Sequence, residues 1–177
     1  MYFDIETTGL DISKDHIVTI QIKDGYGKKV WCKRDYRTES ELIRQFVDYY
    51  LKVDDKFLIG FNISNFDLPL LFAKMAKEDL ARFFSKYNKG YVRDLAMILE
   101  FHKVKRQKLE SIAENCGIDV GNLEEIDVRE LYKNDDWKGI IAYAKSELDI
   151  IEQLFQEMWS QIKRNGHLSF TSQSTKY

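Results

Sequence analysis

The sequence is poor in the residues that mark disulfide-rich, membrane-spanning or strongly charged proteins. It has two cysteines, Cys32 and Cys116, and a single proline in 177 residues. Two cysteines so far apart are too few for a disulfide framework or a zinc site, which favours a reducing, cytoplasmic setting. No run approaches the roughly 18 apolar residues of a membrane span, and we expect no signal peptide. The formal net charge of −2 argues against a general polyanion binder, but metal ions could still supply positive charge for nucleic acid.

What is present is typical of one folded domain in which strands alternate with helices. Apolar residues make up 44% of the chain, enough for a sizeable core. Periodicity predicts strands at 2–6, 16–23, 28–33, 56–61 and 91–93. It predicts helices at 38–52, 62–77, 94–102, 109–118 and 137–159. We therefore expect an α/β fold with a mixed five-stranded sheet flanked by helices, a domain over 1–164 and a polar C-terminal tail over 165–177.

Several residues predict where helices begin and end. Thr38 and Glu41 have the spacing of a capping box. Pro69 fits the first turn of its helix, where a missing N–H costs little. Asp94 is expected to be an N-cap and Gly117 a C-cap.

The chain opens with MYFDIETTGL, in which two acids lie on a strand that otherwise reads as buried. Asp4 and Glu6 project to the same side because strand side chains alternate between faces. Two close carboxylates repel strongly in a dry environment, and a divalent cation removes that repulsion. Oxygen ligands favour magnesium or manganese. The alternative is a pair of ordinary surface acids at an exposed strand end.

Three separate segments carry a family resemblance. FDIETTGL, GFNISNFDLPLL and YAKSELDI resemble, in this order, the three exonuclease motifs of the DnaQ-like 3′–5′ exonucleases, which include the proofreading domains of family B DNA polymerases. LESIAENCGI is similar to the helix that often precedes the third motif. The resemblance runs from residue 2 to about residue 158, and Tyr143 in the third motif is typical of the tyrosine (DEDDy) branch. It implies a ribonuclease H-like fold.

The resemblance also implies an activity and a set of site residues. The activity is a two-metal hydrolysis, with Mg²⁺ or Mn²⁺, of single-stranded or frayed 3′ ends, DNA being favoured over RNA. Asp4 would bridge both ions, Glu6 would hold the first and Asp67 the second. Tyr143 would orient the attacking water. The products would be nucleoside monophosphates.

The sequence departs from the family at the fourth acid. The third motif is Tyr-x-x-x-Asp, but here the chain has Glu147 four residues after Tyr143, followed by Asp149. At about 100° per residue, Glu147 lies about 40° from Tyr143 and beside the apolar stripe. Asp149 lies about 160° from Glu147, on a face expected to be solvated. We therefore expect Glu147 to be the fourth ligand and Asp149 to be a surface acid.

Four further residues match substrate-contacting positions in the family. Thr7 and Leu10 would contact the terminal nucleotide, although Leu10 could be an ordinary loop residue. Asn62 would touch the sugar-phosphate or, alternatively, cap the next helix. Phe66 would stack on a base or pack in the core.

Two questions stay open in the sequence. The basic run KVKRQK at 103–108 could hold the substrate backbone, but a solvated loop is the favoured interpretation. The substitution at Glu147 leaves a second function possible, a nucleic-acid- or protein-binding module that kept the fold and lost its chemistry. An endonuclease of the same broad fold is disfavoured by the tyrosine motif.

Overall fold

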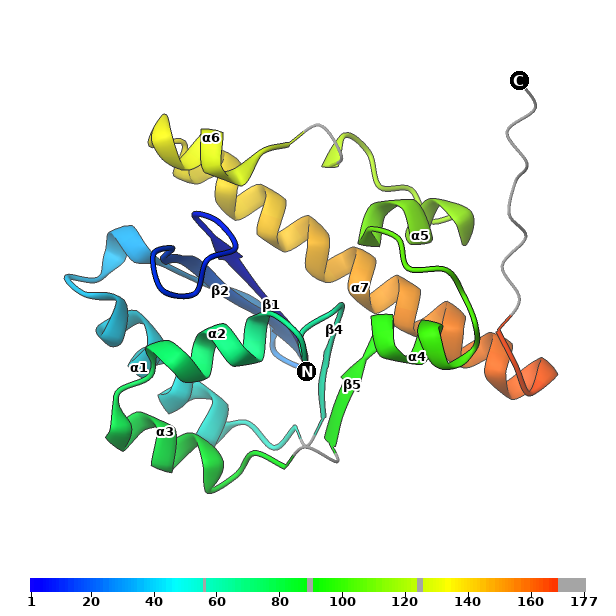
Figure 1. Cartoon of the computed structure of the whole chain (residues 1–177), viewed down its shortest axis with the longest axis horizontal. Coiled ribbons are helices and arrows are strands. Elements are labelled where there is room, and N and C mark those ends of the chain that lie inside the picture. Colours follow the sequence, from blue (N-terminus) through cyan, green and yellow to red (C-terminus); the bar gives the residue numbers. More distant parts are fainter. Residues whose placement is uncertain (56, 89–90, 124–125, 169–177) are drawn as a thin grey trace.

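The structure is a computed structural model that describes residues 1–55, 57–88, 91–123 and 126–168 (Figure 1). Its strands are β1 (Tyr2–Thr7), β2 (Ile17–Asp24), β3 (Gly27–Cys32), β4 (Leu58–Gly60) and β5 (Val92–Asp94). They form one mixed sheet in the order β3-β2-β1-β4-β5. β1, β2 and β3 are antiparallel, and β1, β4 and β5 are parallel. The expected mixed five-stranded α/β fold is confirmed.

Seven α-helices surround this sheet in the described ranges. They are α1 (Glu39–Lys52), α2 (Asp67–Lys74), α3 (Lys77–Phe84), α4 (Leu95–Phe101), α5 (Leu109–Asn115), α6 (Val128–Lys133) and α7 (Trp137–Asn165). A short 3₁₀ turn, η1, covers Lys33–Asp35. None of these helices is both long enough and apolar enough to cross a bilayer.

Most helix boundaries follow the local signals. The Thr38 hydroxyl accepts a hydrogen bond from the Glu41 N–H at 3.1 Å, and the Asp94 carboxylate accepts one from the Ala96 N–H at 3.1 Å. Gly117 directly follows the last turn of α5 with a φ of +75°, which suits glycine. Neither cysteine forms a disulfide, as expected.

Three boundaries differ from the predictions. The helix expected at 62–77 is shorter than predicted: α2 covers only Asp67–Lys74, and the preceding Asn62 has a left-handed φ of +60° that no α-helix adopts. α7 continues past Trp159 to Asn165, where Gly166 ends it in the left-handed conformation. The tail predicted from 165 therefore starts inside α7, and Leu168 is buried. Its residues 169–177 lie outside the described residues.

One face of the sheet is covered by α1, α2 and α3. Phe3 from β1 and Trp31 from β3 contact the Phe46 ring of α1, with ring centroids 5.5 and 5.7 Å apart. Phe83 of α3 packs on Tyr50 of α1 at 4.6 Å. Each such buried side chain stabilises the fold by about 1.5–3 kcal/mol relative to exposure.

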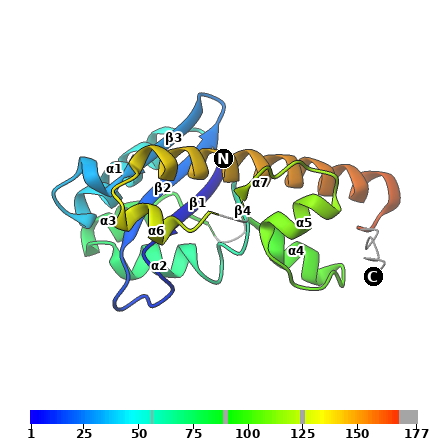
Figure 2. The same cartoon turned by 90° about the horizontal axis from the view of Figure 1, so that it is seen from above.

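The other face is covered by α7, which contacts β1, β2 and β3. In Figure 2 it runs along the opposite side of the sheet from α2. Its first turns pack Trp137 and Ile140 on Val18, and its later turns pack Leu154 and Met158 into the cluster that contains α4 and α5. The middle of α7 therefore lies over β1.

A close backbone approach fixes β4 against β1. A Cβ added to Gly60 would lie 2.6 Å from the Phe3 carbonyl oxygen and 2.4 Å from a methyl carbon of Ile63. Only glycine fits this position without a backbone shift. The loop that leads into α2 is thereby held beside the end of β1.

Candidate active site

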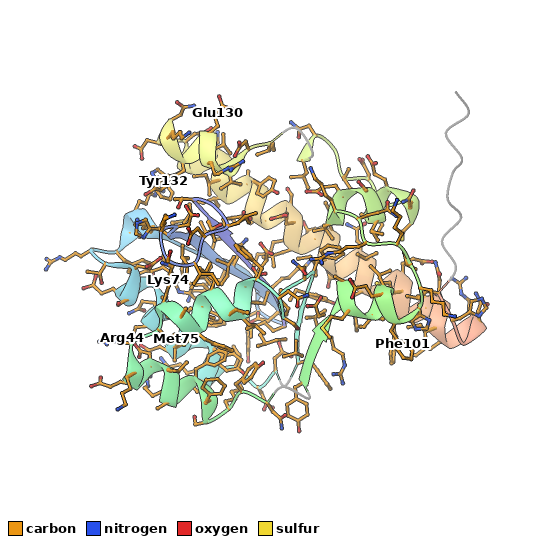
Figure 3. The ribbon with its side chains drawn as sticks, in the orientation of Figure 1. Arg44, Lys74, Met75, Phe101, Glu130 and Tyr132 are labelled. Atoms are coloured by element: carbon orange, nitrogen blue, oxygen red, sulfur yellow. The ribbon has the colours of Figure 1, made fainter. Side chains whose placement is uncertain are left out.

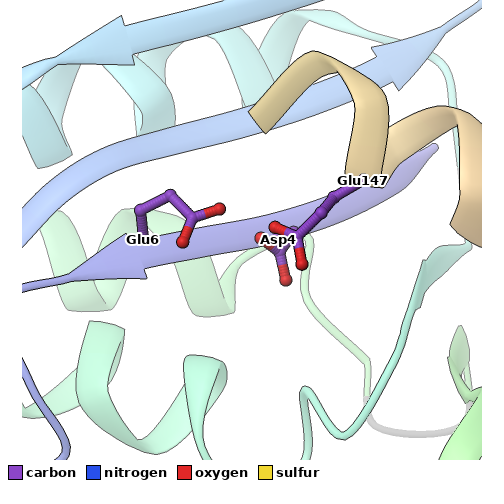
Figure 4. A group of neighbouring side chains, drawn as sticks. All are labelled: Asp4, Glu6 and Glu147. Atoms are coloured by element: carbon purple, nitrogen blue, oxygen red, sulfur yellow. The ribbon is translucent and has the colours of Figure 1, made fainter. Parts of the chain in front are cut away.

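The acids of β1 and α7 converge between the sheet and the helix (Figure 4). Asp4, Glu6 and Glu147 each offer a carboxylate oxygen, and these oxygens lie within 4.8 Å of one another. The fourth predicted ligand, Asp67, is adjacent, because its Oδ1 accepts a hydrogen bond from the Ile5 N–H at 3.0 Å. The structure thus brings the four predicted ligands to one place.

Local sequence explains this convergence. On β1, the apolar side chains of Phe3 and Ile5 pack into the core on one face, which leaves Asp4 and Glu6 on the other. On α7, the buried residues Ala144 and Leu148 turn the helix so that Glu147 reaches the same space. The Glu147 carboxylate thereby joins the group.

Burial makes these carboxylates hard to ionise together. It raises the pKa of Asp4 well above its ordinary value, and the neighbouring charges of Asp67 and Glu6 raise it further. Burial also raises the pKa of Glu6 and, together with Glu6 and Asp4, that of Glu147. It raises the pKa of Asp67 from 3.8 to about 8. The four carboxyls therefore resist being ionised together in the absence of a cation.

The donor set fits a hard divalent cation. Within the described part of the chain, no Lys or Arg side chain forms an ion pair with Asp4, Glu6 or Glu147. Their only side-chain amide donor there is the neutral Gln21, which contacts Asp4 and Glu6. Buried carboxylate oxygens without cationic partners are the ligands that Mg²⁺ and Mn²⁺ prefer.

Tyr143 stands beside the acids, one helical turn before Glu147. Its hydroxyl donates a hydrogen bond to Glu147 Oε1 at 3.1 Å. Burial, followed by the charge of Glu147, raises the pKa of the Tyr143 phenol. The phenol therefore stays protonated and acts as a hydrogen-bond donor, not as a base.

Asp149 lies outside this group. It forms ion pairs with Lys23, at 2.7 Å, and with Lys28 of the β2–β3 hairpin. Although burial raises it, hydrogen bonds from Lys23 and Lys28 bring the pKa of Asp149 below its ordinary value. The residue is partly exposed, as its helix face predicted, but it is held by lysines instead of lying free in solvent.

A cavity of about 530 Å³ opens above the acids. Asp4, Glu6, Asp67 and Glu147 share its lining with Phe61, Asn62, Phe66, Arg106, Gln107 and Lys108. The basic run at 103–108 is largely exposed, as expected, but two of its cations also face the acids across this cavity. The two interpretations of this run are therefore compatible, and the path of the loop between α4 and α5 brings them together.

The predicted substrate-contacting residues surround the same region. A second hollow of about 650 Å³ is lined by Thr7, Leu10 and Phe66 together with Tyr143 and Glu147. Leu10 is 80% exposed at its edge. The Thr7 hydroxyl donates to the Gly9 carbonyl, which shapes the turn after β1. Phe66 both lines the hollow and packs against the core, so its two interpretations are compatible.

Asn62 does not cap α2. Its side-chain oxygen accepts hydrogen bonds from Asn65 and, at 3.2 Å, from the Arg106 guanidinium. Buried Asp94 holds the strained backbone here, because it accepts the N–H groups of Asn62 and Ser64 at 2.8 Å each. The sequence predicted only the capping role of Asp94, since the loop lies some 30 positions away.

A further hollow of about 560 Å³, outside the acidic site, is largely apolar. It is lined by Phe57, Ile59, Arg93, Leu95, Ile98, Phe155, Met158, Trp159 and Ile162, with no Asp or Glu among them. Phe101, at the end of α4 (Figure 3), is 83% exposed and is not part of this lining. This hollow therefore offers no carboxylate ligand for a metal ion.

A mixed sheet whose first strand and last helix bring carboxylates together is typical of metal-dependent nucleases with a ribonuclease H-like fold. The family model of the RNase_H superfamily matches residues 1–159, and the chain belongs to this superfamily. Its members are commonly nucleases that use divalent metals, so membership indicates nucleic-acid chemistry. No curated protein matches the chain.

Proposed function

We propose that the protein is a metal-dependent 3′–5′ exonuclease of the tyrosine (DEDDy) branch of the DnaQ-like group. It hydrolyses single-stranded or frayed nucleic-acid ends, DNA in preference to RNA, and releases nucleoside 5′-monophosphates. Residues 1–164 form its catalytic domain. The observation that supports this best is the Tyr143–Glu147 hydrogen bond beside Asp4 and Glu6, because it joins the third motif to the first.

Asp4, Glu6, Asp67 and Glu147 would hold two Mg²⁺ or Mn²⁺ ions. When bound, such ions activate the attacking water and stabilise the leaving 3′ oxygen. The four side chains supply position and negative charge. The buried setting strengthens each electrostatic contact, because little water screens it.

The remaining residues orient the substrate. The protonated Tyr143 hydroxyl positions the water by hydrogen bonding. Arg106 and Lys108 face the acids across the cavity and would bind backbone phosphates, with Asn62 fixing the guanidinium. Leu10 and Phe66 would contact the terminal base. In hydrolysis the water oxygen bonds to phosphorus, the P–O3′ bond breaks, and a proton lost by the water balances the departing 3′ oxygen, which leaves as a hydroxyl.

The test uses 5′-labelled single-stranded DNA, single-stranded RNA, duplex DNA and an RNA–DNA hybrid, each with Mg²⁺, Mn²⁺ or EDTA. We expect a ladder that shortens from the 3′ end, faster on single strands, and is abolished by EDTA. Asp4→Ala should abolish it, and Asp149→Asn, which changes an acid outside the group, should not.

Other outcomes identify the alternatives. Tight binding of the labelled strands without shortening would indicate a binding module that has lost its chemistry. Cuts inside the hybrid, with no ladder from single strands, would indicate an endonuclease. Either result refutes the exonuclease.

A further inference from the structure

We propose that Gln21 is a positioning residue for the metal-binding carboxylates, held in its working orientation by Thr19. This inference rests on the proposed function, because it assigns a role at the same site. Gln21 lies on β2 directly opposite Asp4, and Thr19 lies opposite Glu6. Both side chains are completely buried. Nothing in the sequence pattern singles them out, because the pairing register between β1 and β2 is not visible there.

The amide of Gln21 connects the first two acids. Its Nε2 donates to Asp4 Oδ2 at 2.6 Å and to Glu6 Oε1 at 3.0 Å. One NH₂ group therefore uses its two protons on two different carboxylates. It fixes one oxygen of each acid and leaves the second oxygen of each unoccupied by this amide. The spacing of the two carboxylates is set by the protein before any cation binds.

Thr19 determines which end of the amide faces the acids. Its hydroxyl donates to Gln21 Oε1 at 2.7 Å. A flipped amide would place its oxygen against the two acids, which accept but cannot donate in the ionised form that binds a metal, and this oxygen would repel both. The Thr19 hydroxyl therefore favours the orientation that the acids need, and it satisfies a carbonyl that would otherwise be buried without a partner.

An uncharged donor suits this position better than a cation would. A Lys or Arg side chain between Asp4 and Glu6 would neutralise part of the charge that attracts a divalent ion. An apolar side chain would leave the two carboxylates free to rotate. Glutamine supplies hydrogen bonds but leaves the full negative charge of the pair for the metal.

The test measures Mn²⁺ binding to the full chain by calorimetry, without nucleic acid. We expect Gln21→Leu to weaken Mn²⁺ binding roughly 10- to 100-fold, as is usual when a residue behind a metal ligand is removed. Thr19→Val, which keeps the shape and removes the hydroxyl, should weaken it less. Gln45→Leu changes an exposed glutamine of α1 and should leave the affinity unchanged.

Two further measurements separate positioning from folding. Melting temperatures in EDTA establish that each variant is folded, and Thr19→Val carries the test if Gln21→Leu does not fold. Exonuclease kinetics should show a lower kcat at limiting Mn²⁺ that recovers as Mn²⁺ is raised, with KM for the strand little changed. Unchanged Mn²⁺ affinity in the folded variants would overturn the role of Gln21.

The wild-type protein distinguishes this failure from failure of the proposed function. If it binds Mn²⁺ and Gln21→Leu weakens that binding, the positioning role is supported even where no strand is cut. If the wild type binds no Mn²⁺, both the exonuclease and the role of Gln21 are refuted.

Discussion

Replacing Asp67 by asparagine should stabilise the metal-free protein at alkaline pH. The amide oxygen of Asn can still accept the Ile5 N–H that Asp67 accepts at 3.0 Å, so the change removes charge with little change of shape. Burial raises the pKa of Asp67 from 3.8 to about 8. A carboxyl whose pKa is raised by folding contributes stability fully below its unfolded-state pKa, and loses this contribution as pH rises through the folded-state value.

The magnitude follows from that shift. Between pH 5 and pH 8 the unfolded chain has lost the Asp67 proton and the folded chain largely keeps it, so stability falls by about 1.4 kcal/mol per pH unit. Over this window the loss is roughly 4 kcal/mol, which Asp67→Asn does not suffer. For a chain of this size this corresponds to a gain in Tm of roughly 10 °C relative to wild type.

The assay compares Tm values of the two proteins in EDTA at pH 5, 6, 7 and 8. Groups far from Asp67 cancel in the difference. Asp4 does not, because the Asp67 charge raises the pKa of Asp4, but its contribution has the same sign, so the gap in Tm should widen steadily towards pH 8. Saturating Mn²⁺ should narrow the gap, because it stabilises the wild type more than a variant that has lost one of its four carboxylate ligands. A gap that does not change with pH would show that folding leaves the ionisation of Asp67 unaltered, and the electrostatic reasoning would be wrong.

Three other predictions concern single side chains. Glu147→Gln should lower kcat more than roughly 100-fold, because a metal ligand matters more than a residue that only supports a ligand. Asp149→Asn should leave kcat intact in the same gel assay and lower the free energy of unfolding by at most about 1 kcal/mol. A larger loss of kcat for Asp149→Asn than for Glu147→Gln would exchange their roles. Arg106→Ala should weaken binding of a single strand in EDTA and reduce the slope of log binding constant against log salt concentration by about 0.7. Fluorescence anisotropy measures both, with Arg37→Ala, at an exposed arginine, as the control. An unchanged slope would show that Arg106 makes no phosphate contact. Asp94→Ala should lose about 1–3 kcal/mol in urea denaturation because backbone N–H groups are left unpartnered; an unaltered midpoint would contradict this.

Hydrophobic periodicity located the elements that carry long patterns. The strands and α1, α4, α5 and α7 follow it within a few residues. α3 and α6 were missed because eight and six residues are too few for a periodic signal. α3 is stabilised by the contacts of Phe83 with distant aromatic rings. Such packing cannot be read from a short segment.

The residues of the candidate site likewise fall into those that the sequence predicts and those that only the structure shows. Helix geometry alone separated Glu147 from Asp149, because both lie on one continuous helix whose buried face is evident in the sequence. Gln21 could not be found, since its place depends on strand register. Arg106 was named only as part of the basic run at 103–108, for which a solvated loop was favoured, because its position depends on the path of that loop. Asp94 was identified as an N-cap, but the hydrogen bond that it accepts from the Asn62 N–H is visible only in the three-dimensional structure.

The position of α7 has a consequence for the timing of activity during synthesis. Tyr143 and Glu147 belong to the last described helix, whereas Asp4 and Glu6 belong to the first strand. A nascent chain that has emerged from the ribosome only as far as α6 already contains the whole sheet but lacks one wall of the acidic cavity. Under the proposed mechanism it cannot cleave nearby RNA, so competence to cut coincides with docking of the final helix.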